Sequence, residues 1–109
     1  MAYSLLFFVL YSCSIKHDMS IKHPSKSESF SFKAPEDSHS ASLFINGESN
    51  GDFEIHISSE GNLYQKHIIH SGTIDTVFSS DWYGAEMGVK YLPLNTSEGE
   101  LEMQCVFYY

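Results

Sequence analysis

Residues 52–57, with the sequence DFEIHI, decide the fold class of this chain. The apolar residues Phe53, Ile55 and Ile57 alternate there with polar ones. Successive side chains point to opposite faces of an extended chain, whereas one face of a helix needs a spacing of about 3.6 residues. The segment therefore predicts a β-strand with one face in a core and the other in water.

The same alternation continues on both sides of this segment, and no stretch has a convincing helical spacing. Turn signals such as Asn46-Gly47, residues 58–61 and Ser71-Gly72 separate the apolar runs. This pattern predicts an all-β domain, a small antiparallel β-sandwich of about seven strands, with a small closed barrel as the alternative. We expect the last strand to lie between two neighbours, because its final residues are aromatic. The expected strands lie around residues 30–32, 43–45, 53–57, 63–70, 74–78, 87–92 and 101–109.

The beginning of the chain differs from the rest, because an apolar run occupies residues 5–10 and ends shortly before Cys13. The run is far shorter than the roughly 20 residues of a membrane-spanning helix and has the length of a signal-peptide core. The segment Leu10-Tyr11-Ser12-Cys13 resembles the lipobox of bacterial lipoproteins, with Leu10 at −3, Ser12 at −1 and Cys13 as the lipidated residue. The alternative is that residues 5–10 form a first strand of the core.

The resemblance is to small lipoproteins of Bacteroidota, and it implies a three-part organisation. Residues 1–12 would be a cleaved signal peptide, and residues 13–27 the lipidated cysteine followed by a polar, flexible tether. Residues 28–109 would be the β-sandwich domain. Acyl chains such as palmitate on Cys13 would anchor the protein in the outer or cytoplasmic membrane, facing the periplasm or the cell surface. Two or more chains give stable anchoring.

The net charge of the chain limits the classes of molecule that it could bind. The whole chain has a formal net charge of −8, with six lysines and no arginine. From residue 34 onward, two lysines stand against 12 acids, which gives −10. Such a domain repels nucleic-acid phosphates and lacks the guanidinium groups that bind them in pairs, so we expect no nucleic-acid binding. The acid excess favours either simple solubility or a basic partner.

The most distinctive candidate for ligand contact is the pair Trp82-Tyr83, which contains the only tryptophan and is followed by Gly84. An exposed pair could stack on a sugar or anchor a protein partner. The alternative is that these aromatic residues close one end of the sandwich core.

Four other sequence features give weaker evidence of a functional site. Residues 47–51 match the G-x-S-x-G pattern of hydrolases, but a strand follows them where that motif needs a helix, so we expect a turn. His67 and His70 are three residues apart and point to opposite faces of a strand. The acidic residues in or near the expected loops do not have the spacing of a calcium-binding loop. Cys105 stands at an apolar position and predicts a small core residue.

Taken together, these residues predict a non-enzymatic binding or structural module of the cell envelope, with no metal and no cofactor. Its contacts would be with the membrane through the lipid on Cys13, and with a protein or carbohydrate ligand. The alternative function is an immunity or inhibitor protein that blocks a basic toxin or enzyme with its acidic surface.

Overall fold

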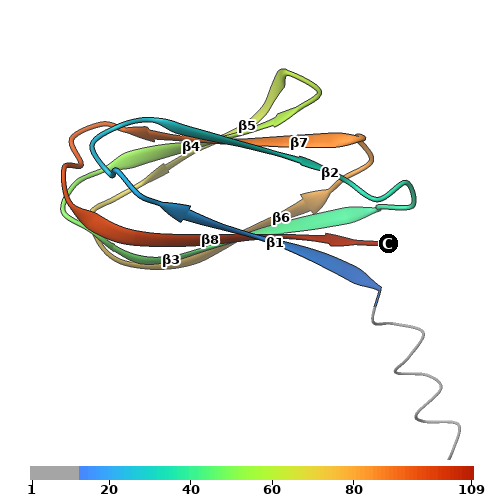
Figure 1. Cartoon of the computed structure of the whole chain (residues 1–109), viewed down its shortest axis with the longest axis horizontal. Helices are drawn as coiled ribbons and strands as arrows, with labels where there is room; N and C mark the ends of the chain where they lie inside the picture. Colours follow the sequence, from blue (N-terminus) through green and yellow to red (C-terminus); the bar gives the residue numbers. More distant parts are fainter. Residues whose placement is uncertain (1–12) are drawn as a thin grey trace, which may run out of the picture.

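The computed structural model describes residues 13–109, which form eight β-strands in two antiparallel four-stranded sheets (Figure 1). The predicted all-β sandwich is confirmed, with one strand more than expected. No helix long and apolar enough to cross a membrane is found in this part of the chain. The strands are β1 (Ser14–Ile21), β2 (Glu28–Lys33), β3 (Ser40–Ser49), β4 (Phe53–Ser59), β5 (Asn62–Ile69), β6 (Gly72–Asp81), β7 (Glu86–Pro93) and β8 (Gly99–Tyr108).

The strands are ordered β1-β8-β3-β6 in one sheet, here called sheet A, and β2-β7-β4-β5 in the other, sheet B. The chain crosses between the sheets at nearly every connection, and only β4 and β5 are both consecutive and paired (Figure 1). This is the strand order of an eight-stranded jelly roll. As predicted, the last strand lies between two neighbours, β1 and β3.

Between the two sheets lies the core, built from alternate residues of each strand. Phe53, Ile55 and Ile57 all point into it with at most 4% of their surface exposed, which confirms the face assignment made from the sequence. The ring of Phe53 packs on that of Tyr91, with centroids 5.2 Å apart. From sheet A, β8 contributes Leu101 and Phe107. Burial of such side chains contributes about 1.5–3 kcal/mol each and holds the sheets together.

The flexible tether predicted over residues 13–27 is wrong for residues 14–21, which form β1. This strand pairs with β8 over its whole length, from Ser14 opposite Tyr108 to Ile21 opposite Leu101. Met19 and Ile21 point inward and are 3% and 6% exposed. Hydrogen-bonded pairing and burial of these two side chains outweigh the polar composition that suggested a tether. The predicted signal peptide at 1–12 and its alternative, a core strand over 5–10, lie outside the described residues.

A second correction concerns Asn46-Gly47, which we expected to end a strand. Instead β3 continues to Ser49, and Asn46 and Gly47 both pair with β6 and β8. Gly47 has a φ of 139°, and a Cβ there would collide with the carbonyl oxygen of Glu100. Glycine is therefore needed here for the close approach of two strands rather than for a turn. The expected hairpin at 58–61 is present, with positive φ at Glu60 and Gly61.

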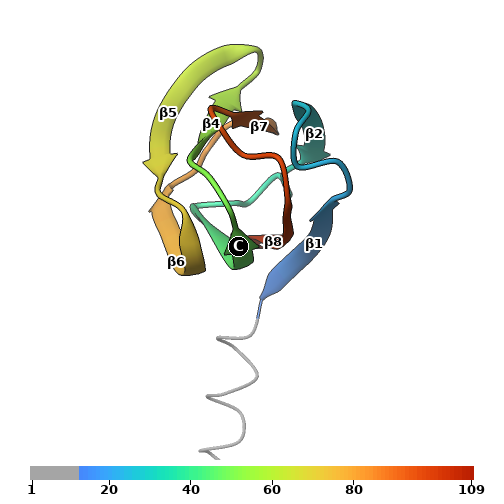
Figure 2. The ribbon, with the colours of Figure 1, turned by 90° about the vertical axis from the view of Figure 1, so that its left-hand side faces the viewer.

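The sandwich has two distinct ends. The Cys13 end contains Cys13, Tyr109 and the loops 34–39, 60–61 and 82–85, because β1 begins and β8 ends there (Figure 1). The opposite end contains the loops 22–27, 50–52, 70–71 and 94–98, which face the viewer in Figure 2. The two ends are joined by strands of up to ten residues, or about 30 Å.

Candidate binding surface

The outer face of sheet A is strongly acidic. Among the described residues, six exposed carboxylates from all four strands point away from the core on this face, against the single lysine Lys16. The outer face of sheet B differs, because Lys33, Lys66 and Lys90 there outnumber Glu54 and Glu86. One of the six, Asp81, stands at the Cys13 end of β6. We call the other five the acidic face; they are Asp18 of β1, Glu48 of β3, Asp75 of β6, and Glu100 and Glu102 of β8.

Strand register brings two of these acids into direct opposition. Glu48 of β3 is the cross-strand partner of Glu100 of β8, and both side chains are exposed. One pair further along, Asn46 stands between Glu102 on one side and Asp75 on the other. Like charges directly opposite each other destabilise a sheet by roughly 0.2–1 kcal/mol. The arrangement therefore has a cost in the free protein that a cationic partner would relieve.

Within residues 13–109, no carboxylate of the acidic face forms a salt bridge, since the ion pairs found there involve Glu54 and Asp52. The face acids that are bonded have neutral partners. Ser20 Oγ donates to Glu102 at 2.6 Å, and Gln104 Nε2 donates to Asp18 at 2.9 Å. These bonds orient the two carboxylates without neutralising them, so the face keeps its full negative charge.

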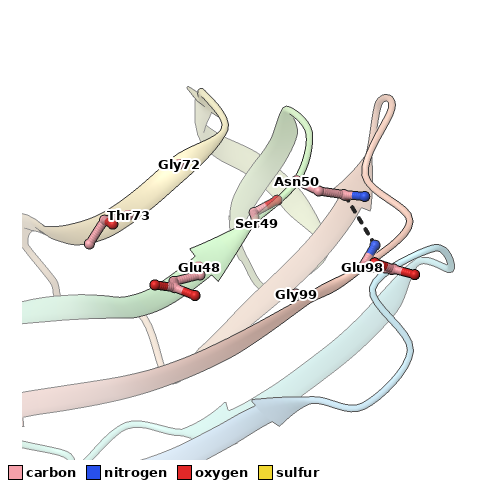
Figure 3. A pocket seen from close by; sticks show the side chains of 7 residues that line it. All are labelled: Glu48, Ser49, Asn50, Gly72, Thr73, Glu98 and Gly99. Carbon is pink, nitrogen blue, oxygen red and sulfur yellow. Dashed lines mark hydrogen bonds between the residues drawn. The ribbon is translucent and has the colours of Figure 1, made fainter.

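Two open depressions lie along this surface. One, of about 410 Å³, is lined by Asp18, Glu102 and Gln104 together with half-buried Phe44, exposed Asn46 and buried Met103. The other, of about 420 Å³, lies at the opposite end from Cys13 and contains Glu48 and Glu98 (Figure 3). Its rim is fixed by Asn50, whose Oδ1 accepts the backbone N–H of Glu98 at 3.0 Å. The surface thus offers charge, hydrogen-bonding groups and the aromatic side chain of Phe44 across β1, β8 and β3.

The G-x-S-x-G pattern falls at this same edge and carries no catalytic geometry. Ser49 is 6% exposed, and its Oγ donates to the carbonyl of Gly51 at 2.6 Å and lies 3.3 Å from Thr96 Oγ1. Its hydroxyl is therefore engaged in holding the β3–β4 connection against the loop that precedes β8. The turn expected over residues 47–51 is wrong for residues 47–49, which belong to β3, and only residues 50 and 51 lie in the connection to β4.

The two histidines lie in different environments, since His67 is half-buried within β5 and His70 is exposed just after its end. His67 stacks on Phe78 at a centroid distance of 3.7 Å, while the side chain of His70 is 82% exposed. Partial burial lowers the pKa of His67. On the outer face, a hydrogen bond from His56 holds the pKa of Glu54 below its usual value. Among residues 13–109, no group of three or more His, Cys, Asp or Glu side chains is placed to hold a metal ion.

The two cysteines have opposite environments. Cys13 is exposed, whereas Cys105 is fully buried beside Met87, with 3.4 Å between the sulfur atoms. Burial raises the pKa of the Cys105 thiol to about 12. Cys105 is thus a core residue, as predicted, and Cys13 is the accessible thiol. The lipid on Cys13 stays a prediction.

Trp82 and Tyr83 do not form one exposed platform. Trp82 is 2% exposed and belongs to the core, while Tyr83 is 76% exposed. The indole Nε1–H donates to the carbonyl of Gly84 at 3.1 Å, and the ring of Tyr64 meets it edge to face at 5.5 Å. The alternative considered for Trp82, closure of the core, describes its position. A ligand-contact role for the pair stays a prediction. Tyr64 was not predicted from the sequence, because only the pairing of β4 with β5 brings it next to Trp82.

Comparison with known proteins places the chain by fold. No protein-family model and no curated protein matches the sequence. A protein of the disulfide-linked pili of Bacillus endospore appendages is similar in structure, with a TM-score of 0.60, 11% identity and coverage of 87% of this chain and 85% of that one. PliG from Aeromonas hydrophila, a periplasmic inhibitor of g-type lysozyme, has a TM-score of 0.57, 10% identity and coverages of 89% and 87%.

A family 35 carbohydrate-binding module from Clostridium thermocellum is also similar, with a TM-score of 0.52, 12% identity and coverages of 88% and 92%. At identities this low, the likeness shows the shared β-sandwich fold alone. The three similar proteins are a pilus component, an inhibitor and a binding module, so the fold is compatible with a non-enzymatic binding module.

Proposed function

We propose that this chain is a lipid-anchored protein of the cell envelope that binds a basic protein through the acidic face of sheet A. The observation that carries the proposal is the opposition of Glu48 and Glu100 within a group of five carboxylates that have no salt-bridge partner among residues 13–109. Solubility alone requires an acid excess but not two acids placed directly opposite each other. A basic partner gains steered association and charge-assisted hydrogen bonds from it.

The anchor in this proposal is Cys13, which the lipobox resemblance marks for acylation. Cys13 is exposed and stands immediately before β1, at the end of the sandwich away from the depression that contains Glu48 and Glu98. Anchoring there leaves the length of sheet A, about 30 Å, reaching away from the membrane. The acidic face is then accessible to a partner in the surrounding compartment.

The fold neighbours support the choice of partner. PliG shows that a β-sandwich of this size serves as an inhibitor of a lysozyme in a periplasm. An inhibitor or immunity role fits this chain best if its partner is a basic enzyme or toxin, because the described domain carries few positive charges of its own. The sandwich then acts as a rigid carrier of charge, and no group of the chain takes part in chemistry.

The test uses Glu100→Lys and binding to two basic probe proteins, a g-type lysozyme and cytochrome c. The substitution places a lysine opposite Glu48 and converts a repulsive pair into an attractive one, so the thermal unfolding midpoint should rise. Affinity for the basic partner should fall by about tenfold at low salt. A change that stabilises the fold and weakens binding cannot be explained by misfolding.

Glu86→Lys is the matched control, because it makes the same charge change at an exposed position on the outer face of sheet B. This variant should bind the probes nearly as well as the wild-type protein. If both variants lose affinity equally, the effect is one of net charge and the acidic face is not the site. If the wild-type protein binds neither probe at low salt, the proposal of a basic partner fails.

A further inference from the structure

A third depression, separate from the acidic face, lies at the Cys13 end. Its volume is about 350 Å³, within the range of small-ligand sites, which starts at about 300 Å³. The loop after β6 forms one wall and the β4–β5 hairpin the other. We call it the tyrosine pocket; its lining residues are Ser59, Tyr64, Asp81, Trp82, Tyr83 and Gly84.

The two walls of the tyrosine pocket pack closely on each other, and its rim is aromatic. Trp82 is held from behind by its hydrogen bond to Gly84, and Gly84 sits so close to Ser59 that a Cβ would collide with the serine Oγ. In front, Tyr64 and Tyr83 expose 50% and 76% of their surface. Large aromatic side chains at the mouth of a depression offer a ligand flat apolar surface.

The polar groups in the pocket restrict what that ligand is. Asp81 brings one carboxylate, and Ser59 and the two tyrosines bring hydroxyls that donate and accept. A purely apolar ligand would leave these groups without partners when it excluded water. A phosphate-bearing ligand would be repelled by Asp81 and by the domain's net charge. A pyranose sugar is complementary to the pocket. Its apolar C–H face can stack on a tyrosine ring, and its vicinal hydroxyls can donate hydrogen bonds to the carboxylate.

We propose that the tyrosine pocket binds a neutral carbohydrate, with Tyr83 stacking on one pyranose ring and Asp81 accepting hydrogen bonds from its hydroxyls. Tyr64 borders the same ring, and Trp82 fixes the position of both walls without itself being exposed. Asp81 lies on the same outer side of sheet A as the acidic face, but at the Cys13 end, whereas the opposed pair Glu48 and Glu100 lies toward the other end of the sandwich. One face therefore serves a protein partner and one end a glycan.

The chain contains its own reporter for this site, because Trp82 is the only tryptophan and it lines the pocket. The probes are cellotetraose, xylotetraose and chitotetraose, titrated into the whole protein while tryptophan fluorescence is recorded. At least one should change the emission with saturation. Tyr83→Ala should weaken that binding by about tenfold or more, whereas Tyr83→Phe keeps the ring and should stay within about threefold.

Tyr109→Ala is the matched control, since Tyr109 is an exposed tyrosine at the same end that does not line the pocket. It should bind sugar as the wild-type protein does. Tetramethylammonium chloride is titrated as a competing chemistry, because aromatic rings beside a carboxylate also suit a quaternary cation. Saturation by that cation without any response to the three sugars would overturn the proposal, and so would sugar binding unaffected by Tyr83→Ala.

Discussion

The backbone N–H of Tyr109 donates a hydrogen bond of 3.2 Å to the carbonyl oxygen of Cys13. The residue proposed to carry the lipid is thus joined to the last residue of the chain, and β1 begins one residue later. No flexible spacer separates Cys13 from the sandwich. Acyl chains on Cys13 would hold the domain by one end, and the depression at the opposite end would lie about 30 Å away from that anchor.

Thiol reactivity should distinguish the two cysteines sharply. In protein expressed without lipidation, iodoacetamide at pH 8 should modify Cys13, which is exposed, and leave Cys105, which is buried with a pKa of about 12. Peptide mass spectrometry of the native and the denatured protein measures both sites. Modification of Cys105 at a similar rate in the native protein would show that β8 is not packed as described.

β1 is an integral part of the core, and Met19→Asp tests this directly. Met19 is 3% exposed, so a carboxylate there is buried without a partner and should lower the thermal midpoint by many degrees. Ser14→Asp, at an exposed position of the same strand, is the control and should change the midpoint little. Equal midpoints for Met19→Asp and wild type would restore the picture of a loose tether.

Stability should fall as the solution is acidified through neutrality. The folded pKa of His67 lies below its ordinary value of 6.5, so the unfolded chain takes up a proton before the folded one does. The contribution of neutral His67 is therefore present above that value and is lost as the pH drops below it. Thermal midpoints measured from pH 7.5 to 5.5 follow this loss.

His67→Phe should flatten that pH dependence while keeping the stack on Phe78. His23→Phe, at an exposed histidine in the loop after β1, is the control for the substitution itself and is measured over the same pH range. An unchanged slope in His67→Phe would mean that the stack on Phe78 does not make protonation of His67 unfavourable.

Strong, local patterns were predictable from the sequence. Phe53, Ile55 and Ile57 are large, strictly alternating and bounded by turn residues, so both the strand and its buried face could be assigned. In β1 the inward positions include Ile15 and His17 among lysines and serines, and the period of two was masked by polar composition. That strand is stabilised mainly by its pairing with β8, which lies far along the chain.

The candidate sites were likewise predictable from the sequence only in part. Composition predicted an acidic domain, but the meeting of Glu48 and Glu100 depends on the register of β3 with β8, which no local pattern specifies. Trp82 and Tyr83 are neighbours in sequence, and adjacent residues of an extended chain point to opposite sides. It could therefore have been predicted that one of the two rings is buried and the other exposed. The contact of Tyr64 with Trp82 could not have been predicted.

The most direct test of a lipid-anchored module is incorporation of radiolabelled palmitate in cells that express the wild-type protein or Cys13→Ala, followed by membrane fractionation. The wild-type protein should be labelled and found in the membrane fraction, whereas Cys13→Ala should be unlabelled and soluble and should still bind its basic partner. A wild-type protein that takes up no label and stays soluble would contradict lipid anchoring at Cys13.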